Sequence, residues 1–145
     1  MDSSKRFQPV RRVAQSREQT AARELGDSQR RMQQQEARLE ELKRYHDEYL
    51  GRFRDAAQLG ISASQLQEYQ AFLNKLTRAI QEQEKIVRST HQECSNKKEI
   101  WQKKRVRSQV LGKVVERFQT AERRAEDSRE QKEQDDRNQR GKRTR

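Results

Sequence analysis

Apolar residues recur every seven positions through the second half of the chain, in two interleaved series. One series comprises Leu66, Leu73, Ile80, Val87, Cys94, Trp101 and Val115, interrupted at Ser108 and ending at Glu122; the other includes Tyr69, Leu76, Leu111, Phe118 and Ala125. Side chains at this spacing form one narrow stripe along an α-helix, a pattern typical of coiled coils. Four further apolar residues widen the stripe, and we expect some of them to remain available to a partner: Phe72, Ala79, Ile86 and Ile100.

The first half of the chain carries a matching stripe. It comprises Leu25, Met32, Leu39, Leu42, Tyr49 and Phe53, with Gln35 and His46 as polar interruptions. Between Gln83 and Lys104 one side of the second stripe turns polar. Polar residues in such a stripe set the register of the two helices at a cost in stability, and a second interpretation is that this stretch flexes.

One strong interruption separates the two stripes, at residues 58–62. Gly60 suits the left-handed position just past a helix C-terminus, because it has no Cβ. Ser62 and Gln65 have the spacing of a capping box, and Ile61 and Leu66 have the spacing of a hydrophobic staple. The end of one helix followed at once by the start of another predicts that the chain turns back as an antiparallel hairpin.

The predicted fold is therefore all-α, a long antiparallel two-helix coiled-coil hairpin. Pro9 is tolerated only in a first helical turn, so helix one should span about 9–58. The turn follows at 59–62, and helix two at about 63–136. We expect residues 1–8 and 137–145 to be disordered basic segments.

Composition and charge restrict the function. Only 29% of the 145 residues are apolar, against about 45–50% in ordinary globular domains, which argues against a conventional core. The net charge of +11 suits nucleic acid, an anionic membrane or an acidic protein face, although interspersed acids are also typical of a solvated helical surface. The basic residues form three clusters: Lys5, Arg6, Arg11, Arg12 and Arg17; Lys97, Lys98, Lys103, Lys104, Arg105 and Arg107; and Arg137, Arg140, Lys142, Arg143 and Arg145.

No part of the sequence predicts membrane insertion, secretion or a disulfide. Apolar runs long enough for a membrane span are absent, as is the apolar core of a signal peptide. We therefore expect a cytoplasmic protein. Cys94 is the single cysteine, so an intramolecular disulfide is excluded.

Enzyme motifs are also absent: the chain has no glycine-rich phosphate loop, nucleophile elbow or Cys-x-x-Cys pair. We predict no catalytic residue, no cofactor and no small-molecule substrate. His91 and Cys94 share a helix face, but zinc needs three or four ligands, so we expect no metal site. Phe7 and Trp101 are the only aromatic residues within the basic clusters, too few for a base-stacking platform, so binding of nucleic acid is the alternative hypothesis.

Residues around the hairpin resemble a known family. The run consists of Tyr45, Glu48 and Tyr49, then Gly60, Ile61, Leu66, Tyr69, Phe72, Leu76, Ala79, Ile80 and Gln83, then Trp101, Lys104, Arg107, Glu116 and Arg117. It is similar to FliJ, a component of the bacterial flagellar type III protein export apparatus, and the likeness covers about residues 13–137.

The resemblance implies a function that periodicity does not show. FliJ proteins resemble the central stalk of rotary ATPases, promote the activity of the export ATPase FliI, couple it to the export gate FlhA and bind export chaperones. The residues that match the family's gate-binding surface are Phe72, Leu76, Ala79 and Gln83, the last replacing a histidine of some members. By analogy with rotary stalks, the residues at the open end that would bind the ATPase are Arg11, Arg12, Arg17, Arg117 and Arg124.

The leading hypothesis is therefore a non-enzymatic stalk and coupling protein of flagellar export, active in flagellum biogenesis and motility. It would work in the cytoplasm, peripherally at the inner membrane through the export apparatus. The alternative is a basic coiled coil that binds nucleic acid, whose affinity would fall steeply with salt.

Overall fold

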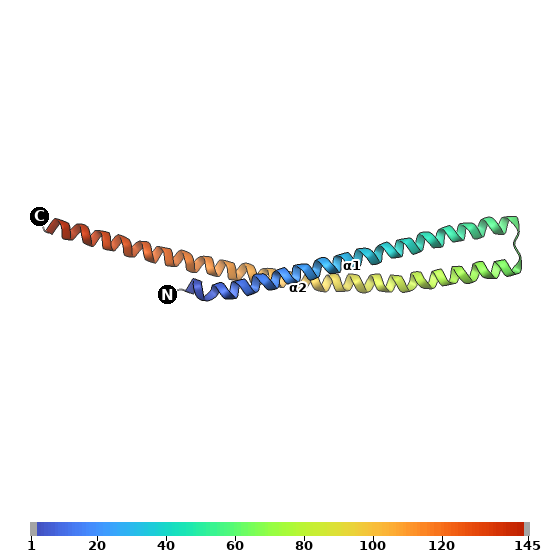
Figure 1. The fold of residues 1–145 in the computed structure, drawn as a ribbon, viewed down its shortest axis with the longest axis horizontal. Coiled ribbons are helices and arrows are strands. Elements are labelled where there is room, and N and C mark those ends of the chain that lie inside the picture. Colours follow the sequence, from blue (N-terminus) through green and yellow to red (C-terminus); the bar gives the residue numbers. More distant parts are fainter. Residues whose placement is uncertain (1–2, 144–145) are drawn as a thin grey trace. The chain divides into compact units, whose positions relative to one another are not determined.

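The computed structural model describes residues 3–143, and its two helices are joined by a turn of three non-helical residues, 60–62 (Figure 1). Helix α1 spans Ser3–Leu59 and helix α2 spans Ala63–Arg143, with 57 and 81 residues. No strand occurs within residues 3–143. The predicted all-α helical hairpin is confirmed.

The structure contains the left-handed glycine and the capping box that the sequence predicts for the turn. Gly60 has φ 88°, in the left-handed region, and its N–H donates to the carbonyl of Ala57 at 3.3 Å. The main-chain N–H of Ser62 donates to Gln65 Oε1 at 3.1 Å, while the N–H of Gln65 donates to Ser62 Oγ at 3.1 Å. This reciprocal pair is the capping box, and it satisfies two main-chain donors at the start of α2.

Both helices extend further than their expected ends. Helix α1 begins at Ser3, so Pro9 lies inside it rather than at its start. The first turns of α1 pack against α2, because Ser4 bonds to Glu122 and Phe7 stacks on Phe118, and these contacts outweigh the hydrogen bond that proline removes. Helix α2 continues to Arg143 through Gly141. Met1, Asp2, Thr144 and Arg145, the outermost residues of the expected disordered segments, lie outside the described residues.

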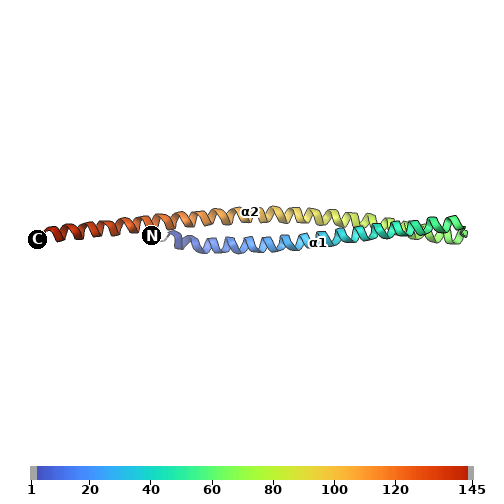
Figure 2. The ribbon, with the colours of Figure 1, turned by 90° about the horizontal axis from the view of Figure 1, so that it is seen from above.

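The contacts of the chain gather into two units, each described separately. The hairpin unit comprises residues 22–99, and the terminal unit comprises the described parts of 1–21 and 100–145. Within the hairpin unit α1 and α2 run side by side in opposite directions in both views (Figures 1 and 2).

Burial in the hairpin unit follows the seven-residue pattern. The half-buried or buried positions of α2 include Tyr69, Leu73, Leu76, Ile80, Gln83, Val87, Thr90, Cys94 and Lys97. Those of α1 include Leu25, Ser28, Met32, Gln35, Leu39, Leu42, His46, Tyr49 and Phe53. These residues form the seam between the helices, as a two-in-seven pattern requires.

The most buried residues in the seam of the terminal unit have small or medium-sized side chains. Val115 is fully buried, and Ala14, Ala21 and Ser108 are each at least nine-tenths buried. Beyond Glu122 every residue of α2 as far as Lys142 is exposed. That final stretch contains mainly strong helix formers, which favour a helix without burial.

Candidate functional site

An aromatic cluster connects the helices of the hairpin unit near the turn. Tyr49 lies at its centre, with ring centroids 4.4 Å from Phe72 and 5.4 Å from Tyr69. Tyr45 approaches Phe72 edge-on at 6.0 Å, and Phe53 lies 5.4 Å from Tyr69. Aromatic pairs at these separations add to the stability that burial provides, so the cluster holds this part of the seam firmly.

The four residues expected to bind the export gate have different environments. Leu76 and Gln83 are each 7% exposed and belong to the seam, whereas Phe72 and Ala79 are half-buried at its edge. The Gln83 amide donates to the main-chain oxygen of Gln35 at 3.0 Å and to its side-chain oxygen at 2.8 Å. Phe72 and Ala79 therefore present more accessible surface to a partner than Leu76 and Gln83 do.

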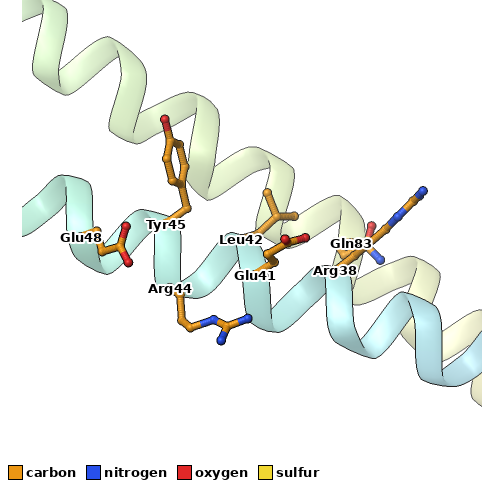
Figure 3. Close-up of a pocket in the computed structure, with 7 residues that line it drawn as sticks. All are labelled: Arg38, Glu41, Leu42, Arg44, Tyr45, Glu48 and Gln83. Atoms are coloured by element: carbon orange, nitrogen blue, oxygen red, sulfur yellow. The ribbon is translucent and has the colours of Figure 1, made fainter.

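A groove of about 550 Å³ lies beside these residues, and α1 forms most of it. Its lining comprises Arg38, Glu41, Leu42, Arg44, Tyr45, Glu48 and Gln83 (Figure 3). Leu42 and Tyr45 point toward α2, while Arg44 points away from it. Tyr45 is 47% exposed even though its ring contacts Phe72, so the groove and the edge of the seam form one continuous surface.

The four gate-binding residues that the family resemblance implies all lie on helix two. The contribution of Tyr45 on α1 to the same surface was not predicted. Tyr45 and Phe72 each precede a seam position, His46 and Leu73, by one residue. In an antiparallel pair, residues that directly precede a seam position project to the same side from both helices. This equivalent position in the seven-residue pattern could have predicted that Tyr45 and Phe72 lie together.

Charged pairs cross the polar part of the hairpin unit. Arg31 Nη2 lies 2.5 Å from Glu93 Oε1, and Lys97 Nζ lies 3.3 Å from Glu24 Oε2. Hydrogen bonds and ion pairs between the helices therefore take the place of apolar contacts here. Because all four of these side chains are partly solvent-exposed, each pair contributes only modestly to stability.

Histidine and cysteine chemistry is limited in the described residues. His91 Nε2 lies 2.5 Å from Glu36 Oε1. Cys94 is a half-buried free thiol in the seam. Within residues 3–143 no three His, Cys, Asp or Glu side chains gather closely enough to hold a metal ion.

The terminal unit contains the five arginines expected to meet the ATPase. The Arg11 guanidinium lies over Gly112, with Nε and Nη2 3.7 Å from the place where a Cβ would stand. Arg117 and Arg124 line a hollow of about 370 Å³ on α2. Arg12 and Arg17 are exposed and belong to neither feature. The structure thus brings Arg117 and Arg124 together in one hollow and places Arg11 against Gly112 of α2.

The start of α1 is attached to α2 through Glu122. Ser4 donates to its carboxylate twice, from the hydroxyl at 2.7 Å and from the main-chain N–H at 3.2 Å. These two hydrogen bonds lower the pKa of Glu122 below 4.5, since they favour the ionised form. Phe7 and Phe118 stack with their centroids 5.3 Å apart, one turn after Ser4 in α1 and one turn before Glu122 in α2.

No helix within the described residues is long and apolar enough to cross a membrane. Together, the two paired helices, the capped turn and the seven-residue seam define a coiled-coil hairpin protein.

Comparison with known proteins identifies the family. The sequence matches the family described as "Flagellar FliJ protein" over residues 3–145. It is 30% identical over 124 residues to the "Flagellar FliJ protein" of Escherichia coli K12, covering 86% of this chain and 84% of that protein. No solved structure matches the chain significantly. The chain belongs to the flagellar FliJ protein family and is a component of the flagellar protein export apparatus.

Proposed function

We propose that this protein is the non-enzymatic stalk and coupling protein of flagellar export. It promotes the activity of the export ATPase FliI, links that ATPase to the export gate FlhA, and binds export chaperones. The observation that carries the proposal is the accessible aromatic surface beside the groove, where Tyr45 and Phe72 meet at the edge of the seam.

Gate binding involves the four matched residues in two ways. Phe72 and Ala79 contact the gate directly, together with the exposed ring of Tyr45. Leu76 and Gln83 act from within the seam, because their side chains are occupied by contacts with α1. Replacing either of these two would alter the shape of the surface rather than remove a contact with the gate.

ATPase binding uses the arginines of the terminal unit. Arg117 and Arg124 lie seven residues apart on one side of α2, where two cations can face a single acidic surface. Arg11, Arg12 and Arg17 add positive charge from α1. Complementary charge mainly increases the rate of encounter and sets orientation, as a coupling protein requires.

The proposed protein needs no cofactor, metal or small-molecule substrate. It works in the cytoplasm and reaches the inner membrane only through the other export proteins. Nucleic acid is not among its partners.

The direct test is a titration of the cognate export ATPase with this protein. We expect the rate of ATP hydrolysis and the fraction of assembled ATPase to rise to saturation near a fixed stoichiometry. A matched control is an unrelated basic coiled coil of similar charge, which should have no such effect. An unchanged rate and an unchanged assembly state across the titration would contradict the proposal.

A further inference from the structure

Five valines of the terminal unit lie outside its seam. Val10 and Val13 belong to α1, and Val106, Val110 and Val114 belong to α2. Val10, Val13, Val106 and Val110 are 43%, 50%, 59% and 54% exposed, and Val114 is half-buried. We call these five residues the valine face.

The seam places Val10 and Val114 on the same side of the unit. Val10 directly precedes the seam residue Arg11, and Val114 directly precedes the seam residue Val115. In an antiparallel pair, residues at this position project to the same side from both helices. The antiparallel pairing of Arg11 with Gly112 sets Val10 about level with Val114.

The remaining valines extend this surface outward. Val13 lies one turn from Val10 along α1, and Val110 lies one turn from Val114 along α2. Val106, one more turn along, lies further around α2 toward its outer surface. The result is an apolar strip that crosses both helices instead of following one of them.

Basic residues lie at both ends of the apolar strip, on the same side of the terminal unit as the valines. Residues at the equivalent seven-residue positions are Arg6, Arg17, Lys103, Arg107, Arg117 and Arg124, all of them exposed. These positions contain no acidic residue in 3–21 and 100–124. None of the six cations takes part in the ion pairs found among residues 3–143. Their charge is therefore not neutralised on this side.

We propose that the valine face is the docking surface for an acidic protein, one with an apolar ridge flanked by carboxylates. An apolar centre inside a polar, charged rim is the usual anatomy of a protein interface, and here the rim is mainly positive, with Glu116 the one carboxylate in the hollow that Arg117 and Arg124 line. Complementary charge requires carboxylates on the partner. The inference rests on the proposed function, and of the five arginines it places Arg17, Arg117 and Arg124 on the side of the terminal unit that faces the export ATPase.

Other partners with negative charge fit this surface less well. Duplex DNA would use the cations but gain nothing from the four exposed valines, and single strands need aromatic stacking platforms. Membrane-surface helices bury a continuous face rich in Trp, Phe and Leu. The valine face contains none of these residues.

Two variants test the apolar and the charged parts separately in the full chain. Val13→Thr combined with Val110→Thr keeps the branched shape of both side chains while making them polar. Arg117→Glu reverses one charge on the valine face. Arg123→Glu is the matched control, because Arg123 is also exposed on α2 but projects from the opposite side. Helicity by circular dichroism should be the same in all four proteins.

Binding of each protein to the purified export ATPase is then measured by titration calorimetry. We expect the valine variant and Arg117→Glu each to weaken binding by about tenfold or more, and Arg123→Glu to change it by less than about threefold. Equal losses for Arg117→Glu and Arg123→Glu, or an unaffected valine variant, would overturn the valine face while leaving ATPase binding intact.

Failure of the proposed function has a different signature. If the unaltered chain neither binds nor activates the ATPase, the proposed function fails, and with it this partner for the valine face. Parallel titrations with random duplex DNA and with phosphatidylglycerol-containing vesicles complete the test. Binding to either at physiological salt that the valine variant abolishes would overturn the choice of a protein partner.

Discussion

The side-chain amide of Gln83 donates to two oxygens of a single residue, the main-chain and side-chain oxygens of Gln35, at 3.0 and 2.8 Å. The pair lies within the seam, where Gln83 is 7% exposed. A polar pair of this kind specifies one register, because sliding either helix would leave buried amides without partners.

Breaking this pair from one side should destabilise the hairpin. Gln83→Leu leaves the Gln35 amide without its partner, and we expect the free energy of unfolding to fall by about 1–3 kcal/mol. Replacing both glutamines with leucine should recover most of the loss, since no amide is then left unpaired. Urea unfolding followed by circular dichroism measures both values. The exposed Gln81→Leu serves as the control, and a double variant less stable than the single one would refute this account.

The turn depends on glycine at residue 60. Gly60 has φ 88°, and no heavy atom lies within 4 Å of the place where a Cβ would stand, so substitution causes backbone strain rather than a clash. We expect Gly60→Ala to lower the free energy of unfolding by about 1 kcal/mol. Gly51→Ala is the matched control: it also meets open space but lies inside α1, so it should stabilise by about 0.5–1 kcal/mol. Changes of the same sign in thermal unfolding would contradict the prediction.

The attachment of the start of α1 should depend on pH. Its hydrogen bonds with Ser4 lower the pKa of Glu122 in the folded protein below 4.5, so the contact stabilises above the unfolded pKa. That stability is lost as the pH falls through the lowered folded pKa. We expect the NMR signal of the Ser4 amide proton to shift in this acid range.

Glu122→Gln provides the control for that titration. A glutamine side chain still accepts a hydrogen bond but carries no charge and does not titrate. Its Ser4 amide signal should therefore stay nearly constant over the same range. A shift of equal size in this variant would show that another carboxyl group is responsible.

Some residues of the proposed gate-binding surface should contact the gate directly, and others should only stabilise the fold beneath it. Tyr45→Ala removes a side chain that is 47% exposed, so it should weaken binding to the export gate by about tenfold and lower the free energy of unfolding by less than Leu76→Ala does. Leu76→Ala truncates a seam side chain and should lower the free energy of unfolding by about 2 kcal/mol or more. Gate binding by calorimetry and urea unfolding on the same samples distinguish these effects. Equal losses of stability would refute the division.

Much of the fold follows from local rules that act over a few residues. The seven-residue spacing of apolar positions predicts both helices and the seam between them. The turn is predictable because Gly60, Ser62 and Gln65 satisfy its geometry and its hydrogen bonds within a few residues of one another. Helix ends were predicted less well: Pro9 lies inside α1 because contacts of Ser4 and Phe7 with α2 extend the helix toward the N-terminus.

The candidate site was only half predictable. Phe72 and Ala79 lie at the edge of the seam as an available surface, in agreement with the widened stripe. The seven-residue pattern also placed Leu76 and Gln83 in the seam, yet a family resemblance counted them as binding residues. Gln83 is held in the seam by its hydrogen bond to Gln35 of α1. This acceptor lies 48 residues away in the sequence, so the bond could not be predicted from the residues around Gln83.

The sequence by itself determined that this chain forms two helices joined by one turn, since helix periodicity and capping depend on neighbouring residues. The tertiary structure alone decided which side chains stay accessible. Tyr45 joins Phe72 across the seam, Arg11 lies over Gly112, and Ser4 bonds to Glu122. Each contact joins residues far apart in the chain, and only the register of one helix against the other brings them together.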